Sequence, residues 1–289
     1  MFMKSQKATA ILLLSCPDQK GIVAEISSFI YKHNGNIIHS DQHTDFETRT
    51  YFMRIEWELE GFQIKDEQIE EAFSPIAKKF NMNWELHFSK NIKRMAIFVS
   101  KLDHCLYDVL LKTKSKELNA EIPLVISNHM DLKPIADYFN IPFHHFPVIP
   151  ENKEEVEKKE IELLKSRNID LIVLARYMQI LGPSFVKAYP NKIINIHHSF
   201  LPAFIGAKPY QQAYNRGVKV IGATSHYVTE ELDNGPIIEQ DVIRVSHRDS
   251  LEDFIQKGKE LEKIVLSRAI KYHLEDKTLV FGNKTVVFD

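Results

Sequence analysis

Five short apolar runs, separated by stretches with helical spacing, constrain the fold of the second part of this chain most strongly. These runs are residues 94–99, 122–127, 143–146, 170–174 and 192–197. Strands that are apolar throughout and alternate with helices are typical of βαβ units, whose parallel sheet is buried on both faces. We therefore expect an α/β fold with a doubly wound, mostly parallel sheet. The remaining predicted elements are two later strands, a long amphipathic helix and a terminal hairpin, at 219–228, 236–245, 251–273 and 279–288.

The first 88 residues show a different order of elements. Helical spacing follows the first and third of four predicted strands, which lie at 8–15, 36–43, 48–59 and 83–88. This βαββαβ order is the ferredoxin-like arrangement. In the third strand, Met53 and Ile55 alternate with Arg54 and Glu56, which predicts one buried face and one mostly wet face. We therefore expect an N-terminal domain at 1–88, a linker at 89–93 and a second domain at 94–289.

Composition and charge argue against several classes of protein. The chain has 289 residues, of which 44% are hydrophobic and 26% charged, as in ordinary globular proteins. Its net charge of -2 gives no support to a surface for nucleic acid or for an anionic membrane. The apolar runs are too short to span a bilayer, and the first residues lack the apolar core of a signal peptide. We expect a cytoplasmic protein in which Cys16 and Cys105 are free thiols.

The strand at 192–197 ends on residues whose side chains can take part in catalysis. Asn195 and His197 project from one face of a strand because they are two residues apart, and Asp233 follows 36 residues later in a strong turn signal. Ligands of open α/β sheets bind beyond the carboxyl ends of the strands, where His197 lies. A histidine can move a proton near neutral pH, an amide can donate to an oxyanion, and a carboxylate can orient water or the imidazole. These residues predict acyl chemistry without a metal, although an Asn-x-His pair taken alone is more often structural.

The placement of glycines argues against the common nucleotide sites. No glycine occurs between Gly61 and Gly182, and the turn after the strand at 94–99 is Ser100-Lys-Leu-Asp-His104. A Rossmann fingerprint or a P-loop needs glycines in that turn, so that the backbone can approach phosphate. We therefore expect no dinucleotide or ATP site of the usual kind. The sequence also contains no metal motif of the His-Glu-x-x-His type.

Two long segments give these residues a family context. Residues 195–206 (NIHHSFLPAFIG) and 222–238 (GATSHYVTEELDNGPII) resemble the formyltransferase family that uses 10-formyltetrahydrofolate. The resemblance covers roughly residues 94–275. It implies that the amide, the histidine and the aspartate described above are the catalytic residues.

The same resemblance implies a folate pocket along the segment 174–181 and the loop 228–233. The implied substrate-binding residues are Arg176, Met178, Gln179, Ile180, Leu181, Val228 and Glu230. For the apolar members of the segment, Met178, Ile180 and Leu181, packing in the core is the alternative interpretation, because such side chains are commonly buried.

The N-terminal βαββαβ unit resembles the ACT domain, a small module that often binds amino acids at domain interfaces. Asn34, Gly35 and Asn36 lie between the first helix and the second strand, which matches a common ligand loop of that family. The alternative for Gly35, which we weigh slightly higher, is that it ends the helix. The resemblance implies an amino-acid effector and, because ACT units often pair through their sheets, a homo-oligomer.

The resemblance also implies the reaction. Members that formylate glycinamide ribonucleotide carry a glycine-bearing phosphate loop after the first strand, and members that formylate transfer RNA carry an extra C-terminal barrel; this chain shows neither. We therefore expect a hydrolase that converts 10-formyltetrahydrofolate to tetrahydrofolate and formate, supplies formate for purine synthesis and balances the one-carbon folate pools. Folate is the substrate, and no cofactor or metal is required. The alternatives are a transferase acting on glycinamide ribonucleotide or another amine, and a regulatory amino-acid-binding protein with an inactive enzyme domain.

Overall fold

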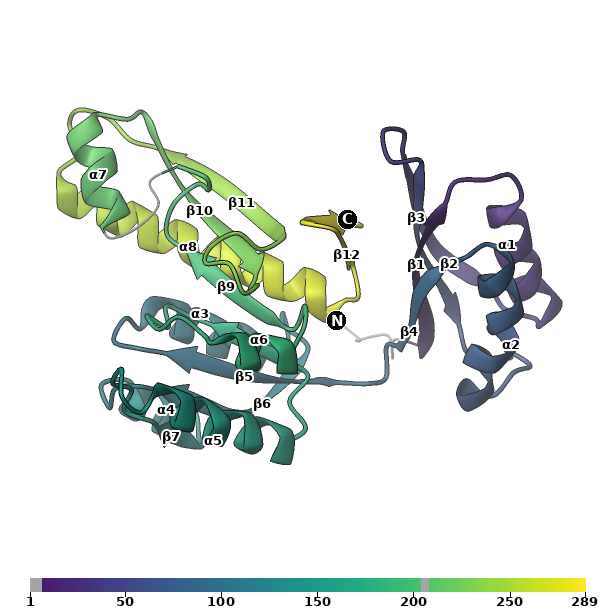
Figure 1. Ribbon diagram of the computed structural model, residues 1–289, viewed down its shortest axis with the longest axis horizontal. Helices are drawn as coiled ribbons and strands as arrows, with labels where there is room; N and C mark the ends of the chain where they lie inside the picture. The colour runs from purple at the N-terminus through teal and green to yellow at the C-terminus, as the bar shows by residue number, and fades with distance from the viewer. Residues whose placement is uncertain (1–6, 204–207) are drawn as a thin grey trace. The chain divides into compact units, whose positions relative to one another are not determined.

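The computed structural model describes residues 7–203 and 208–289, which form two compact units (Figure 1). The first unit comprises the described residues up to Ile92, together with Glu275–Leu279 and Val287–Asp289. The second comprises the described residues of Lys93–Leu274, together with Val280–Val286. The last residues of the chain are thus divided between the two units, a feature that the strand and helix patterns do not reveal.

The first unit is a four-stranded antiparallel sheet with two helices packed on one face. Its elements are β1 (Thr9–Pro17), α1 (Ile22–Lys32), β2 (Ile37–Asp45), β3 (Thr50–Glu58), α2 (Asp66–Lys79) and β4 (Asn83–Phe88). The sheet order β2-β3-β1-β4, with every pair antiparallel, confirms the predicted ferredoxin-like arrangement. Leu12 and Met53 of the central strands pack with Ile26 of α1 and Phe73 of α2, and all four side chains are buried.

The other face of β3 is not wet at its centre, so that part of the prediction was wrong. Arg54 is only 3% exposed. Its Nε atom donates to the carbonyl oxygen of Asp276 at 2.9 Å, and its Nη2 atom donates to the carbonyl oxygen of Glu275 at 3.2 Å and to Glu56 at 2.9 Å. The segment Glu275–Leu279 of the same unit therefore covers this side chain and satisfies its donors, which a strand pattern cannot show.

The second unit is built on a seven-stranded sheet. Its strands are β5 (Lys93–Val99), β6 (Ala120–Ser127), β7 (Phe143–His145), β8 (Leu171–Leu174), β9 (Ile193–His197), β10 (Val220–Tyr227) and β11 (Ile237–Arg244). Its helices are α3 (His104–Lys114), α4 (Lys133–Tyr138), α5 (Lys153–Ser166), α6 (Pro183–Ala188), α7 (Pro209–Arg216) and α8 (Leu251–Leu274). A hairpin of β12 (Thr278–Phe281) and β13 (Lys284–Val287) follows α8, as predicted.

The order of the large sheet is β11-β10-β9-β8-β5-β6-β7, and it confirms the doubly wound, mostly parallel prediction. Only β10 runs antiparallel to its neighbours. From β5 the chain first moves outward through β6 and β7, and then returns to place β8 and β9 on the other side. The strand order therefore reverses between β5 and β8, and in open α/β sheets ligands bind beyond the carboxyl ends of the strands at such a point.

Both faces of this sheet are covered. Met95, Ile97 and Val99 of β5 belong to one buried cluster with residues of α3, α4 and α8. Ala96 and Phe98, which alternate with them, belong to a second cluster with residues of α5 and α6. The central strands β5, from Met95 on, and β8 are accordingly apolar and buried. Within the described ranges, no helix is long and apolar enough to cross a membrane.

The long helix α8 contains a glycine at a point of close packing. A Cβ atom on Gly258 would lie 2.2 Å from the ring of Tyr210, which belongs to α7. The ring cannot easily move away, because its hydroxyl group donates to Glu262, one turn further along α8, at 2.5 Å. Gly258 therefore leaves space for the ring of Tyr210, which is held by its backbone in α7 and by the hydrogen bond of its hydroxyl group to Glu262.

We predict that Gly258→Ala lowers the free energy of unfolding by about 1–3 kcal/mol, the usual cost of overpacking. This cost outweighs the roughly 1 kcal/mol by which alanine is favoured over glycine inside a helix. Urea denaturation measures the difference. Gln256→Ala, at an exposed position of the same helix, serves as the control and should change stability by less than about 0.5 kcal/mol. A Gly258→Ala protein more stable than the wild type would contradict the packing argument.

Candidate active site

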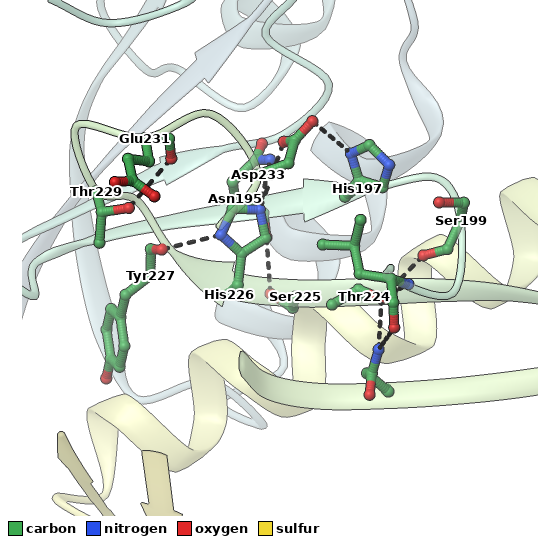
Figure 2. A network of polar contacts seen from close by, with 12 residues as sticks. Asn195, His197, Ser199, Thr224, Ser225, His226, Tyr227, Thr229, Glu231 and Asp233 are labelled. Carbon is green, nitrogen blue, oxygen red and sulfur yellow. Dashed lines mark hydrogen bonds and ion pairs between the residues drawn. The ribbon is translucent and has the colours of Figure 1, made fainter. Parts of the chain in front are cut away.

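The site is assembled where β9 pairs with β10. Asn195 and His197 lie on β9, and their partners in the register of the sheet are His226 and Thr224. As expected from their spacing, Asn195 and His197 share a face of the strand, and Figure 2 shows both side chains close to the carboxylate of Asp233. His197 is the last residue of its strand, at the carboxyl edge of the parallel part of the sheet.

The connection between β10 and β11 brings Asp233 to this edge. The connection is closed by a hydrogen bond from the Tyr227 N–H to the Pro236 carbonyl oxygen at 2.9 Å. Asp233 itself has a φ of 53°, in the left-handed region that aspartate tolerates better than most residues. Gly235 is required, because a Cβ atom there would lie 1.8 Å from the carbonyl oxygen of Tyr227. The Asp-Asn-Gly-Pro turn thus allows the backbone to fold back sharply and place one carboxylate over the end of β9.

The carboxylate of Asp233 is bracketed by two imidazoles. Its Oδ2 atom lies 3.2 Å from Nδ1 of His197, and its Oδ1 atom lies 3.7 Å from Nε2 of His226. The Nδ1 atom of His226 donates to the Tyr227 carbonyl oxygen at 2.9 Å, because that oxygen can only accept. The Nε2 atom of His226 also lies 3.2 Å from Nδ2 of Asn195, so His226 contacts both the amide and the carboxylate of the site.

These contacts determine the charge of the site. The pKa of Asp233 lies well below its ordinary value. The hydrogen bond to the imidazole of His197 is the largest cause, and the one to His226 adds to it. Asp233 is therefore a carboxylate at neutral pH, and it fixes Nδ1 of His197 as a donor. The Nε2 atom of His197 is buried and has no hydrogen-bond partner among the residues that the structure describes. Because Nδ1 is the donor to Asp233, Nε2 can take a proton from, or return one to, a molecule bound beside it.

The neighbouring His198 remains neutral. Its pKa is lowered to about 3, mainly by burial and in addition by the positive charge of Arg176. The His198 ring lies 5.3 Å from the ring of His197 and 6.0 Å from that of Tyr210. Because the second histidine is uncharged, it does not compete with His197 for the negative charge of Asp233.

A second group of polar side chains lies on the far side of His198. Glu262, only 1% exposed, accepts hydrogen bonds from Nε2 of His104 at 2.8 Å and from the hydroxyl group of Tyr210 at 2.5 Å. The Nε atom of Arg176 lies 3.4 Å from Glu262, so the carboxylate also has a buried cationic neighbour. We call His104, Arg176, Tyr210 and Glu262 the Glu262 cluster.

The Glu262 cluster is a hydrogen-bonded ion pair rather than a cation site. His104, Cys105 and Glu262 do offer ligand atoms within 4.8 Å of one another. However, burial raises the pKa of the Cys105 thiol well above its usual value, and both oxygens of Glu262 already accept hydrogen bonds. The guanidinium of Arg176 would also repel a metal ion bound there.

The predicted folate-binding residues fall into two groups. Met178 and Ile180 are 59% and 57% exposed, which favours the pocket interpretation over core packing. Leu181, at 7% exposed, belongs to a buried cluster against which Val228 packs, which favours the packing interpretation for Leu181. The structure brings the segment and the loop to the same region. Glu230 of the loop pairs at 3.3 Å with Lys187 of α6, the helix that follows the segment.

The two polar members of the predicted segment differ in exposure. Arg176 is buried in the Glu262 cluster, and its backbone has a φ of 63°. Gln179 is half-buried. The assignment of both residues to substrate binding remains a prediction.

The predicted effector loop of the first unit is held by its own contacts. Asn34 adopts the left-handed conformation, with a φ of 62°, and its side chain donates to the Gly61 carbonyl oxygen at 2.9 Å. Gly35 donates its N–H to the Ile30 carbonyl oxygen at 2.9 Å, which supports the interpretation that it ends α1. The side chain of Asn36 donates to Glu58 at 3.1 Å. An effector at this loop remains a prediction.

Four residues near the site were not singled out from the sequence. His226 has no local signal of its own in the sequence, although its position beside Asn195 follows once β9 and β10 are paired. His104, Tyr210 and Glu262 come from three different helices and have no local signal. Only a structure brings them together.

Comparison with known proteins places this geometry in a family. A model of the formyl transferase family matches residues 93–270, and a model of the ACT domain matches residues 10–76. A formyltetrahydrofolate deformylase of Synechocystis sp. is 56% identical over 98% of this chain and 99% of its own length. The crystal structure of a formyltetrahydrofolate deformylase from Pseudomonas syringae has 49% identity and a TM-score of 0.96, covering 99% of this chain and 96% of that chain.

A more distant structure matches part of the chain. Glycinamide ribonucleotide transformylase 1 from Symbiobacterium toebii is 29% identical, with a TM-score of 0.65, and covers 71% of this chain and 98% of that chain. The fold and the site thus define an ACT-containing protein of the formyltransferase class. Because the high identity extends over almost the whole length, the chain belongs, within that class, to the formyltetrahydrofolate deformylase family.

The neutral His198 gives a prediction for stability. In the unfolded chain this histidine takes a proton near pH 6.5, whereas in the folded protein it does so only near pH 3. Between these values the unfolded state binds the additional proton, so the free energy of unfolding falls as the pH falls, by up to about 1.4 kcal/mol per pH unit from this residue. Denaturant titrations between pH 6.5 and pH 4 should show a shallower slope for His198→Gln than for the wild type. Equal slopes would mean that His198 is protonated in the folded protein.

Proposed function

We propose that this protein hydrolyses 10-formyltetrahydrofolate to tetrahydrofolate and formate. The observation that carries the proposal is the Asp233–His197 pair at the carboxyl end of β9, in which Nε2 of His197 has no hydrogen-bond partner among the described residues, in a chain of the deformylase family. The proposed role of the reaction is to supply formate for purine synthesis and to balance the one-carbon folate pools.

In the proposed mechanism, Asp233 and His197 act on water as one unit. The carboxylate accepts a hydrogen bond from Nδ1 of His197, so that Nε2 has a lone pair and can take a proton from water. The water oxygen attacks the formyl carbon, and negative charge develops on the formyl oxygen. Asp233 stabilises the imidazolium that forms.

Asn195 and the imidazolium complete the reaction. The amide nitrogen of Asn195 lies 3.2 Å from Nε2 of His226 and carries two N–H groups, one of which can donate to the oxyanion. Such a donor typically lowers the activation barrier by about 2.7–4 kcal/mol. His197 then returns the proton to N10 as the C–N10 bond breaks. The second proton of the water leaves when formic acid ionises to formate.

The folate is proposed to lie over the exposed apolar side chains beside Asp233. Met178 and Ile180 come from the segment after β8, and Leu232, 61% exposed, adjoins the aspartate in the opposite loop. Exposed apolar groups of this size around a polar centre are typical of ligand sites. The remaining predicted contacts are Arg176, Gln179, Leu181, Val228 and Glu230. The chemistry of the three catalytic groups requires no cofactor.

We also propose a cytoplasmic location and a regulatory role for the ACT domain. Cys16 and Cys105 are buried free thiols, as expected in a reducing compartment. The ACT match over residues 10–76 supports an amino-acid effector and a homo-oligomer.

Asp233→Asn should reduce kcat by about 10³- to 10⁴-fold, because an amide can orient neither the imidazole nor the water as a carboxylate does. Folate binding, measured by fluorescence titration, should change by less than threefold, roughly 0.6 kcal/mol. Asp137→Asn, at an exposed position paired with Lys133, is the matched control and should retain full activity. Near-normal formate release from Asp233→Asn would remove the aspartate from the mechanism.

The acceptor is tested by a formate-release assay with and without glycinamide ribonucleotide. The proposed function predicts formate at the same rate in both reactions, with no formylated nucleotide, because water is the acceptor. If release depends on the nucleotide and its formyl adduct accumulates, the protein is a transferase.

Calorimetry of the full chain against a panel of amino acids tests the regulatory role. We expect one amino acid to bind with a dissociation constant below about 1 mM, roughly 4 kcal/mol, and to change the rate of hydrolysis. Asn36→Ala should weaken this binding without changing the basal rate. The regulatory proposal fails if no amino acid binds or if binding leaves the rate unchanged.

A further inference from the structure

The carboxyl ends of β5 and β8 form the point at which the strand order of the large sheet reverses. A crevice at this point is where doubly wound sheets usually bind a ligand. Here the turn after β5 runs from Ser100 to His104, and the turn after β8 includes Arg176. Neither turn contains a glycine. Ser100 and Arg176 are buried and His104 is half-buried, whereas Lys101 and Asp103 are exposed.

Hydrogen bonds hold the two turns together. The hydroxyl group of Ser100 accepts the Met178 N–H at 3.0 Å and donates to the side chain of Asn128 at 2.7 Å. Ser100 is 3% exposed and Asn128 is 8% exposed, so this bridge is dry. It fixes the separation of the turns after β5, β6 and β8.

The Glu262 cluster also joins the turns after β5 and β8. His104 comes from the turn after β5, Arg176 from the turn after β8, and both approach Glu262 of α8. The carboxylate of Glu262 keeps its negative charge in the interior of the protein. Burial alone would raise the pKa of Glu262, but the hydrogen bond from His104 and the charge of Arg176 lower it below its ordinary value. Because carboxylate and guanidinium are both buried, neither can swing out of the crevice without leaving an uncompensated charge behind.

The cluster adjoins the catalytic residues through one side chain. His198 lies between the rings of His197 and Tyr210, at 5.3 Å and 6.0 Å. If the formyl carbon lies beside Nε2 of His197, as the proposed function requires, an acceptor larger than water on this side would meet the side chains of His104 and Arg176.

We propose that the Glu262 cluster determines the acceptor of the reaction: by filling the crevice between β5 and β8, it excludes amines from the formyl carbon and leaves water as the nucleophile. This inference rests on the proposed function. His104 and Arg176 are specificity-determining residues in this account, because they act by excluding a competitor of water.

Opening the crevice should allow aminolysis. An added primary amine would attack the formyl carbon, the C–N10 bond would break, and a proton from the amine would pass to N10. The products would be tetrahydrofolate and the N-formyl amine. Glycinamide is a suitable probe because it is larger than water and carries one primary amine.

The test uses the double variant Arg176→Gly/Glu262→Gln. Glycine is compatible with the φ of 63° at position 176, and glutamine avoids leaving a buried carboxylate without its cationic neighbour. The full-length proteins are incubated with 10-formyltetrahydrofolate and glycinamide, and mass spectrometry gives the ratio of N-formylglycinamide to formate. We expect the double variant to raise this ratio at least tenfold over the wild type. Lys101→Ala, an exposed change in the same turn, is the control and should leave the ratio unchanged.

A second variant keeps the inference testable if the first does not fold. His104→Ala opens the crevice from the other turn and retains the Arg176–Glu262 pair, and it should raise the ratio at least threefold. Unchanged ratios in a folded double variant or in His104→Ala would overturn the inference, as would efficient aminolysis by the wild type. A wild type that releases no formate would instead refute the proposed function, so the two failures are distinguishable.

Discussion

The position of one carboxylate between two imidazoles is the interaction on which the site depends. Asp233 contacts His197 on one side and His226 on the other, and these contacts keep it ionised. An ionised Asp233 in turn fixes the orientation of His197, whose other ring nitrogen is then available to a substrate. Without the carboxylate, the three polar residues at the end of β9 and β10 would be an ordinary buried network.

The fold delivers this arrangement through sheet geometry. The antiparallel pairing of β10 with β9 places His226 opposite Asn195, and the β10–β11 connection returns across the end of β9. Gly235 permits the tight closure of that connection. On the other side of His198, Arg176 from the turn after β8 pairs with Glu262 of α8, near the point where the strand order reverses. One edge of the sheet thus carries the reactive groups and, beside them, the Glu262 cluster that we propose excludes amines.

The sequence was sufficient for features that depend on local periodicity. Alternation along a strand placed Asn195 and His197 on one face, and the turn residues around Asp233 marked its loop. It was insufficient where residues meet across long separations, as His104 and Glu262 do over 158 positions, because no periodicity links them. The burial of Arg54 has the same origin, since the backbone that covers it lies more than 220 residues away. Strand patterns report which face is apolar, but they do not report which later segment covers the other face.

The central claim is that water attacks the formyl carbon directly under the control of Asp233 and His197. A single-turnover reaction in water labelled with ¹⁸O, with enzyme in excess over 10-formyltetrahydrofolate, tests it most directly. The account predicts that each formate released in that first turnover contains one labelled oxygen. Unlabelled formate would contradict it, because the added oxygen would then have come from a protein carboxylate rather than from water.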